Sequence, residues 1–385
     1  MWLTGRLAPD FKTIADFRKD NGPAIRATCR RFIDLCRRLD LFSHAVAAID
    51  GSKFKAVNAR DKNFTKAKLK KRMDQVEASI EHYMAALETA DRQEGELAQT
   101  RSVRLKDKIA ALREQMAAFK ALEPVVQAAP DEQVSLTDPD ARSMATSGRG
   151  SGVVGYNVQA AVDAKYHLIV AHEVTNVGND RAQLANMAGQ AKAAMGADTL
   201  DVLADRGYFS GEEVLACESL GVKPYMPKPL TSGSKAKGRF GKQDFVYVAA
   251  TDVYRCPAGK QLTRRFATVE HEMTLHTYWT TRCGDCPLKP RCTTGKERRI
   301  KRWEHETVID AMQERLDRAP HAMRIRRATV EHSFGTLKAW MGAAHFRTRT
   351  LDKVKTEMSL HVLAYNLKRM ITTLGPNSLI EAIRA

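Results

Sequence analysis

The chain has 385 residues, 43% of them hydrophobic, and can bury a core in one large domain with insertions or in two to three modules. Lys and Arg outnumber Asp and Glu by 62 to 45, and the net charge of +17 indicates a polyanionic partner such as nucleic acid. No segment approaches the roughly 18 consecutive apolar residues of a membrane span, and the N-terminus lacks a signal-peptide core. We therefore expect a soluble, cytoplasmic protein without a membrane partner.

Residues 9–41 follow a helical pattern with one apolar stripe, formed by Ile25, Cys29, Phe32, Ile33 and Cys36. The two cysteines are most simply core residues of this helix. We assign residues 1–42 to a helical N-terminal region.

The segment AVAAIDGSKFKAV, residues 45–57, is typical of a strand buried on both faces that ends on a carboxylate. A rigid element therefore positions Asp50. Nine Lys or Arg and a single acid, Asp61, lie between Lys53 and Arg72, so the positive charge is concentrated directly after this strand.

Residues 65–124 are charged, amphipathic and interrupted near Gly95. The pattern predicts a helical hairpin of about 60 residues, which we assign with its linker to an insertion at residues 66–145. A solvated coiled-coil spacer and a DNA-binding arm are both consistent with this composition.

The next segments predict a mixed α/β sheet flanked by helices. In chain order they are strands at 153–163 and 167–175, a helix at 180–196, a strand at 199–210, a helix at 211–221 and a strand at 222–229. The strand at 199–210 places Asp205 just past Val202, Leu203 and Ala204, so a second central strand also ends on an acid. Asn157 and Gln159 on the first of these strands either face the acids or make sheet-edge hydrogen bonds.

A third acid lies on a helix near the C-terminus. In RIRRATVEHSFGTLKAWMG, helical spacing forms a buried stripe from Val330, Phe334, Leu337 and Met341. Glu331 lies next to this stripe, with Arg327 one turn before it and Lys338 two turns after it.

Three converging carboxylates repel one another unless cations lie between them. Such oxygen ligands suit Mg²⁺ or Mn²⁺, and two such ions support in-line phosphoryl displacement, as in nucleases and strand-transfer enzymes. Each acid also has a simpler explanation. Asp50 can be a turn residue before Gly51, Asp205 can pair with Arg206, and Glu331 can be a surface acid paired with Arg327.

Four of the seven cysteines lie between residues 256 and 292. Cys256, Cys283, Cys286 and Cys292 are candidate thiolate ligands of a structural Zn²⁺, with His271 or His276 as a substitute for one of them. Reduced core cysteines are the alternative. We assign residues 231–317 to a β-rich insertion that carries this cluster.

Five segments resemble one family: AIDGSKFKAVNARDKNFT, GYNVQAAVD, LADRGYFS, YRCP with CGDCPLKPRC, and RRATVEHSFGTLKAWMG. In this order they are similar to the DDE transposases of bacterial insertion sequences, specifically the IS1182 group of the IS4/IS5-like set. The resemblance implies an RNase H-like catalytic core, formed by residues 43–65, 146–230 and 318–375. It also implies a metal-binding triad at Asp50, Asp205 and Glu331 that holds two Mg²⁺, or Mn²⁺, and cleaves and joins DNA.

The partners implied are the terminal inverted repeats and the target DNA, in the bacterial cytoplasm and on the nucleoid. The residues expected to contact DNA are Lys53, Lys55, Arg60, Arg324, Arg327 and Lys338. The family often has a tyrosine where this chain has Arg324. Relatives also carry further helices before Met1, so we expect the chain to lack part of the N-terminal region.

Two DNA ends must be held together during transposition, so we expect a homodimer in the active complex. An RNase H-like nuclease that cleaves without joining is one alternative. A truncated, catalytically idle DNA-binding descendant is the other.

Overall fold

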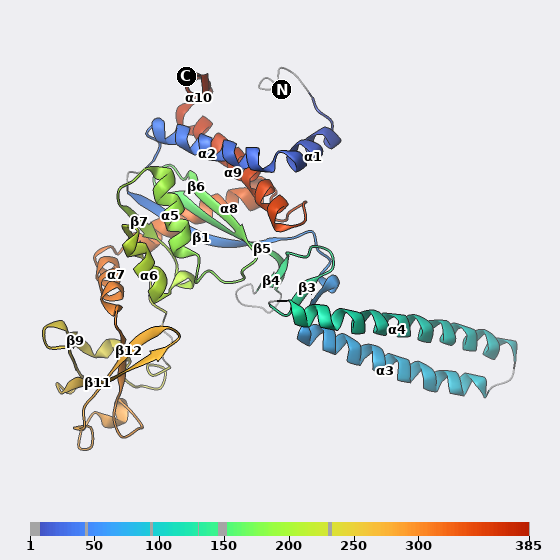
Figure 1. Ribbon diagram of the computed structural model, residues 1–385, viewed down its shortest axis with the longest axis horizontal. Coiled ribbons are helices and arrows are strands. Elements are labelled where there is room, and N and C mark those ends of the chain that lie inside the picture. Colours follow the sequence, from blue (N-terminus) through green and yellow to red (C-terminus); the bar gives the residue numbers. More distant parts are fainter. Residues whose placement is uncertain are drawn as a thin grey trace.

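A computed structural model describes residues 8–42, 45–92, 95–129, 131–144, 152–229 and 233–384. Its body is a mixed sheet covered by helices, from which a long helical hairpin and a smaller β-rich unit extend in different directions (Figure 1). No helix within the described ranges is long and apolar enough to cross a membrane.

The main sheet confirms the mixed α/β prediction. Its strands are β4 (Arg142–Met144), β5 (Val153–Asp163), β1 (Val46–Lys55), β7 (Leu200–Leu203) and β8 (Val222–Tyr225) in that spatial order, with β6 (Ile169–Thr175) also paired to β5. Strand β1 is antiparallel to β5 and parallel to β7, and β7 is parallel to β8.

Strand β1 lies in the middle of the sheet because its apolar residues have packing partners on both faces. Ala47 and Ile49 pack into one hydrophobic cluster and Ala48 into another. At the far end of β1 the neighbouring strand approaches very closely: a Cβ on Gly155 would lie 1.9 Å from the Phe54 carbonyl oxygen, so only glycine permits this pairing.

Helices cover both faces of the sheet. They are α2 (Gly22–Arg38), α5 (Leu184–Met195), α6 (Gly211–Ser219), α7 (Glu306–Arg318), α8 (Ala322–Gly335) and α9 (Leu351–Leu374). The terminal helices α1 (Phe11–Asp20) and α10 (Pro376–Arg384) pack on α9. The cluster on one face includes residues of α2, α5 and α6, and the cluster on the other includes residues of α8 and α9. The apolar stripe predicted for the N-terminal helix is buried on α2, as expected.

The hairpin consists of α3 (Lys66–Asp91) and α4 (Glu96–Ala128), which pack side by side. Strands β2 (Asn63–Thr65) and β3 (Gln133–Ser135) pair at its base. A small cluster of Phe64, Leu69 and Val126 fills the interior there. The hairpin is therefore anchored at one end and extends away from the sheet (Figure 1).

The β-rich unit has its own antiparallel sheet. The spatial order is β13 (Ile300–Trp303), β12 (Met273–Trp279), β11 (Gln261–Glu270), β10 (Val253–Arg255) and β9 (Val246–Val248). Its core is small, with Phe245, Tyr254, Leu262, Tyr278 and Ile300 as the buried members.

Candidate active site

Asp50 and Asp205 come together where the pairing of β1 with β7 ends. Asp50 lies within β1, which continues to Lys55 and pairs Asp50 with Ala160 of β5, so the expected end of this strand at the acid is wrong. Asp205 caps the short 3₁₀ turn Arg206–Tyr208 that follows β7. Because β1 and β7 are parallel neighbours, with Ala48 opposite Leu203, the two acids lie just past the last paired residues of these strands. The Asp205 carboxylate also accepts a hydrogen bond of 2.7 Å from the Gly207 amide, which orients it.

One guanidinium group lies between the two carboxylates. Arg326 Nη2 on α8 is 2.7 Å from Asp50 Oδ1 and 3.6 Å from Asp205 Oδ2. The Arg326 side chain is only 13% exposed, and its Nε is buried without a hydrogen-bond partner in the described structure. Arg326 therefore offsets part of the negative charge of the pair, and its own hydrogen-bonding capacity is not fully used.

The environment of Asp50 disfavours its charge. Burial raises the pKa of Asp50 from 3.8 to about 6. The Arg326 guanidinium opposes this increase, whereas the negative charges of Asp205 and Asp180 add to it. The site therefore concentrates negative charge for which a single cation compensates incompletely.

Glu331 lies on a different stripe of α8. Its exposed carboxylate is 3.9 Å from Arg327 Nε, and within the described residues no hydrogen bond or ion pair joins it to either aspartate. Lys338 lies in the π-helical segment Thr336–Trp340 that follows α8, and it donates 2.6 Å and 2.9 Å hydrogen bonds to Ser52 Oγ and the Lys53 carbonyl. This segment thus contacts β1 two to three residues past Asp50, whereas Glu331 is exposed.

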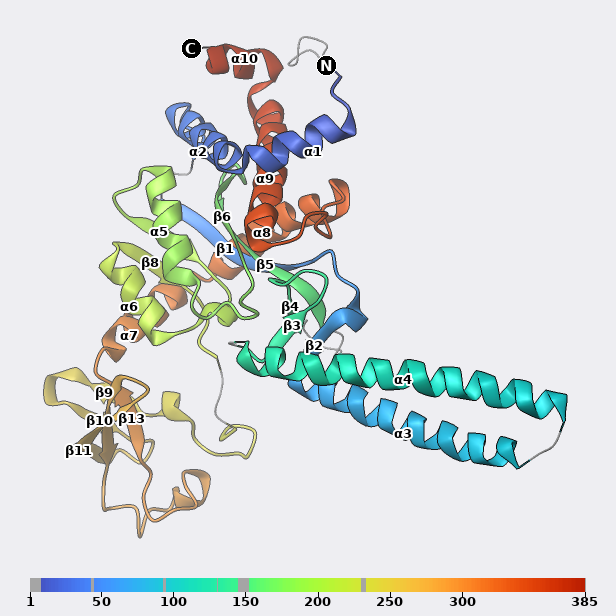
Figure 2. The same cartoon turned by 45° about the vertical axis from the view of Figure 1, so that its right-hand side comes forward.

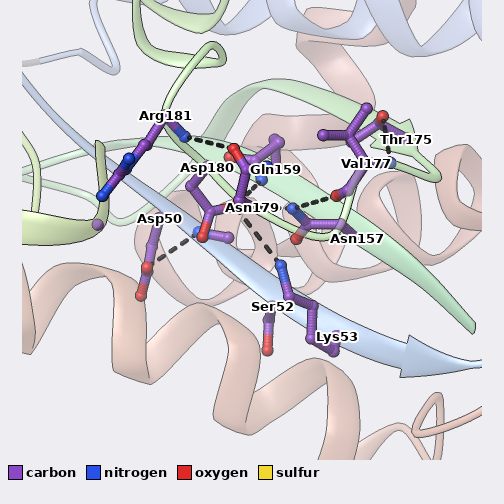
Figure 3. A network of polar contacts seen from close by, with 12 residues as sticks. Asp50, Ser52, Lys53, Asn157, Gln159, Thr175, Val177, Asn179, Asp180 and Arg181 are labelled. Atoms are coloured by element: carbon purple, nitrogen blue, oxygen red, sulfur yellow. Dashed lines mark hydrogen bonds and ion pairs between the residues drawn. The ribbon is translucent and has the colours of Figure 1, made fainter. Parts of the chain in front are cut away.

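A polar network supports β1 next to Asp50 (Figure 3). Asp180 Oδ1 accepts 2.7 Å hydrogen bonds from the fully buried amides of Asn157 and Gln159, and lies 3.6 Å from Lys53 Nζ. Glycine at position 51 leaves room for this arrangement, because a Cβ there would be 2.6 Å from both Asp180 Oδ1 and Gln159 Nε2. Asn157 and Gln159 therefore lie inside the fold, not at a sheet edge.

The network continues to the turn that carries Asp205. The buried Tyr208 hydroxyl donates to Gln159 Oε1. Because Tyr208 lies three residues after Asp205, this bond connects the loop of the second acid to the strand beside Asp50.

The family pattern described as a transposase DDE domain matches residues 129–367. The chain belongs to the DDE transposase family. The match includes Asp205, Arg326 and Glu331, whereas Asp50 precedes it. No curated protein and no solved structure matches the chain.

The basic residues expected to contact DNA in this transposase have different surroundings. Lys55, Arg324 and Arg327 are exposed. Lys53 is 16% exposed and directed toward Asp180, and Lys338 is held against β1. The Arg60 side chain lies outside the part of the chain that the structure describes.

The four predicted cysteine ligands converge. Cys256, Cys283, Cys286 and Cys292 line one cavity of about 30 Å³ in the β-rich unit. Burial raises the pKa of the Cys292 thiol, and the nearby charges of the other three cysteines add to the increase. In the described ranges, no set of three or more His, Cys, Asp or Glu side chains already has the arrangement of a metal site.

Two residues of the site, Arg326 and Asp180, were not predicted from the sequence. Arg326 lies one turn before Val330 and so belongs to the buried stripe of α8, and this spacing could have identified it. Asp180 lies in the connection between β6 and α5, where no periodic pattern marks a buried acid.

Proposed function

We propose that this transposase cleaves and joins the ends of an insertion sequence of the IS1182 group, by metal-dependent phosphodiester hydrolysis and transesterification. The observation that carries the proposal is the pair of carboxylates, Asp50 and Asp205, that share one guanidinium just past the paired residues of the parallel strands β1 and β7. A surface acid or a simple turn residue does not need a buried arginine between it and a second acid.

The strand arrangement supports an RNase H-like core. Three antiparallel strands, β6, β5 and β1, continue into two parallel strands, β7 and β8. The helical hairpin follows β1, and the β-rich unit lies between β8 and α7, so both interrupt this core as insertions.

The residues present fit a hard divalent cation. Asp50 Oδ1 and Asp205 Oδ2 both approach the Arg326 guanidinium, whose Nε has no hydrogen-bond partner in the described structure. A metal ion that took the place of this guanidinium would have two carboxylate ligands. Bound Mg²⁺ or Mn²⁺ supplies activation of the attacking oxygen and stabilisation of the leaving oxygen in in-line displacement.

The other residues have supporting roles in this proposal. Glu331 is the third carboxylate, supplied by α8, which also contributes Arg326. Lys338 holds the stretch of β1 after Asp50, through its bonds to Ser52 and the Lys53 carbonyl. The exposed Lys55, Arg324 and Arg327, together with Arg60, contact the phosphodiester backbone by charge-assisted hydrogen bonds.

The test compares wild type, Asp205→Asn and Asp201→Asn on a labelled duplex that carries the element's terminal repeat, with Mg²⁺. Asp201 lies on β7, four residues before Asp205, and accepts a hydrogen bond of 3.2 Å from the Tyr225 hydroxyl, so it controls for loss of a nearby carboxylate. We expect nicked and joined products from wild type and Asp201→Asn, and neither product from Asp205→Asn.

Other outcomes separate the alternatives. Nicking without joined products from wild type would assign the protein as a nuclease. DNA binding without cleavage would indicate an idle descendant. Sedimentation of the protein on paired ends tests the proposed homodimer.

We also propose that the four cysteines of the β-rich unit hold one structural Zn²⁺. Their convergence on a single cavity supports this, as does the small core of the unit, since metal binding adds folding free energy where burial is limited. Elemental analysis should give about one zinc per chain in wild type, much less in Cys283→Ser, and the wild-type content in Cys217→Ser, which changes a buried cysteine of α6. Absence of zinc from wild type purified without chelator would refute it.

A further inference from the structure

Charge on α3 is divided between its two ends. The first seven residues contain five cations and no acid: Lys66, Lys68, Lys70, Lys71 and Arg72. The remaining residues contain five acids and no Lys or Arg: Asp74, Glu77, Glu81, Glu88 and Asp91. The cations therefore gather at the root of the hairpin, which we define as residues 66–75.

This distribution opposes the helix dipole. The N-terminus of a helix carries partial positive charge, so each cation in the first turns costs roughly 0.3–1 kcal/mol at low salt, and acids at the other end are also unfavourable. The five cations of the root therefore do not stabilise α3. A polyanionic partner is a physical reason for their position.

The two ends of α3 also have different neighbours. Beyond the root, the 2.8 Å hydrogen bond from Ser102 Oγ to Asp91 places the acidic end of α3 beside the first turns of α4, which carry Arg101 and Arg104. At the root, Lys66 pairs with Glu132 at 3.2 Å and Arg72 with Asp61 at 3.4 Å, and both pairs are exposed. Exposed pairs of this kind contribute little.

Lys70 and Lys71 are exposed, and neither forms an ion pair with another described residue. Lys68 is held in place, because its Nζ donates to the Asn63 carbonyl at 2.8 Å and lies 5.3 Å from the centre of the Phe64 ring. The root thus combines an ordered cation with free ones.

The cations of the root line a recess. Lys68, Lys71, Arg72 and Gln75 are spaced at i, i+3, i+4 and i+7, so they share one face of α3, and their side chains border a shallow depression that is open to solvent. Three cations and one amide around an open recess are complementary to phosphate oxygens.

The root also lies close in sequence to the catalytic strand. Strand β1 carries Asp50 and ends at Lys55, and β2, which leads directly into α3, begins at Asn63 (Figure 2). The five residues from Asp50 to the end of β1 span about 17 Å. A duplex that reaches Asp50 can therefore continue along β1 toward the root.

We propose that the root binds the phosphodiester backbone of duplex DNA, outside the carboxylate site and independent of sequence. The inference rests on the proposed function in one respect, that the duplex is the substrate. Lys70, Lys71 and Arg72 contact phosphates, while the rest of the hairpin positions them.

The test measures DNA affinity against salt concentration with a fluorescent 40-base-pair duplex in EDTA, so that no cleavage occurs. The root variant is Lys70→Gln with Lys71→Gln and Arg72→Gln. The matched control replaces Arg101, Arg104 and Lys106 of α4 with glutamine, which removes the same charge from exposed positions of the same hairpin. The logarithm of the association constant falls linearly with the logarithm of the salt concentration, and each lost phosphate contact makes this slope less steep by about 0.9. We therefore expect a slope that is less steep by about 2.7 in the root variant and little change in the control.

A charge-reversed variant excludes unfolding as the cause. Lys70→Glu with Lys71→Glu places acids near the helix N-terminus, where they are favourable, so its melting temperature should not fall while its DNA affinity decreases further. Equal affinity and slope in the root variant and the control would overturn the proposal. So would a root variant that loses self-association but keeps its DNA affinity.

The DNA-affinity test of the root can fail or succeed independently of the proposed catalytic function. Binding in EDTA does not require that the carboxylates act in cleavage. Cleavage that persists in Asp205→Asn would refute the catalytic assignment and leave the root result unaffected.

Discussion

Replacing Asp50 with asparagine should stabilise the metal-free protein at neutral and alkaline pH while it removes a ligand of the proposed metal site. Burial raises the pKa of Asp50 from 3.8 to about 6, so the folded protein holds this proton more tightly than the unfolded chain does. The corresponding stabilisation is fully present below pH 3.8 and is lost as the pH rises through about 6. Asparagine has a similar shape and no charge to bury.

The magnitude follows from the pKa. A change from 3.8 to about 6 corresponds to about 3 kcal/mol at about 1.4 kcal/mol per unit, and the Asp50 side chain is 22% exposed, so most of this applies. The pKa of about 6 already includes the opposing effect of the Arg326 guanidinium, 2.7 Å from Asp50 Oδ1, so the loss of this ion pair is not counted a second time. The pH-dependent part of the difference is therefore the quantity to measure.

Urea unfolding of wild type and Asp50→Asn in EDTA, from pH 4.5 to pH 8, tests this. The free energy of unfolding of the variant relative to wild type should increase by about 2 kcal/mol across this range, with most of the increase below pH 7, since the rest of the change falls below pH 4.5. The exposed Asp61→Asn controls for loss of one negative charge. A relative stability of Asp50→Asn that is constant with pH, or that falls as the pH rises, would refute the reasoning.

Three further variants test the supporting structure by urea unfolding. Gly51→Ala should cost about 1–3 kcal/mol, since its Cβ would lie 2.6 Å from Asp180 Oδ1 and Gln159 Nε2, and a cost near zero would contradict this packing. Tyr208→Phe should cost about 1–3 kcal/mol, since it leaves the buried Gln159 Oε1 without its donor, and an unchanged midpoint would argue against that bond. Desolvation lowers the pKa of His172 from 6.5 to about 4, so stability should be lost as the pH falls from 6.5 to 4, by up to about 1.4 kcal/mol per pH unit. His172→Gln should lose less stability than wild type over that interval, and an identical pH profile would contradict the assignment.

Much of the fold could be predicted from the sequence because local patterns determine it. A continuous apolar run is typical of a strand buried on both faces, and the runs before Asp50 and Asp205 are found on neighbouring parallel strands, although β1 continues to Lys55 and does not end at Asp50 as predicted. The interruption near Gly95 likewise predicted the turn of a helical hairpin that the structure contains. The metal-binding roles of the acids remain predictions.

The remainder depends on contacts between distant segments. Arg326 meets Asp50 only because α8 packs on β1, nearly 280 residues later in the chain. Asp180 meets Gln159 only because the loop after β6 folds back over β1. No local propensity records such pairs, since in the sequence an isolated Arg or Asp has the same appearance at the surface and in a buried network.

The same physical problem arises at two regions of the transposase, one acidic and one basic. Beside β1 and β7 two carboxylates lie close together, burial disfavours the charge of Asp50, and the protein compensates in part with one buried cation, Arg326, whose Nε is unsatisfied. At the hairpin root, cations are concentrated where the helix dipole disfavours them, and the acids paired with them are exposed. Each arrangement costs folding free energy. In the two proposals a ligand of opposite charge relieves this cost, a divalent cation at the acids and phosphate at the lysines. Because DNA with its metal ions would supply both charges at once, one proposed substrate accounts for two unfavourable features that packing alone does not explain.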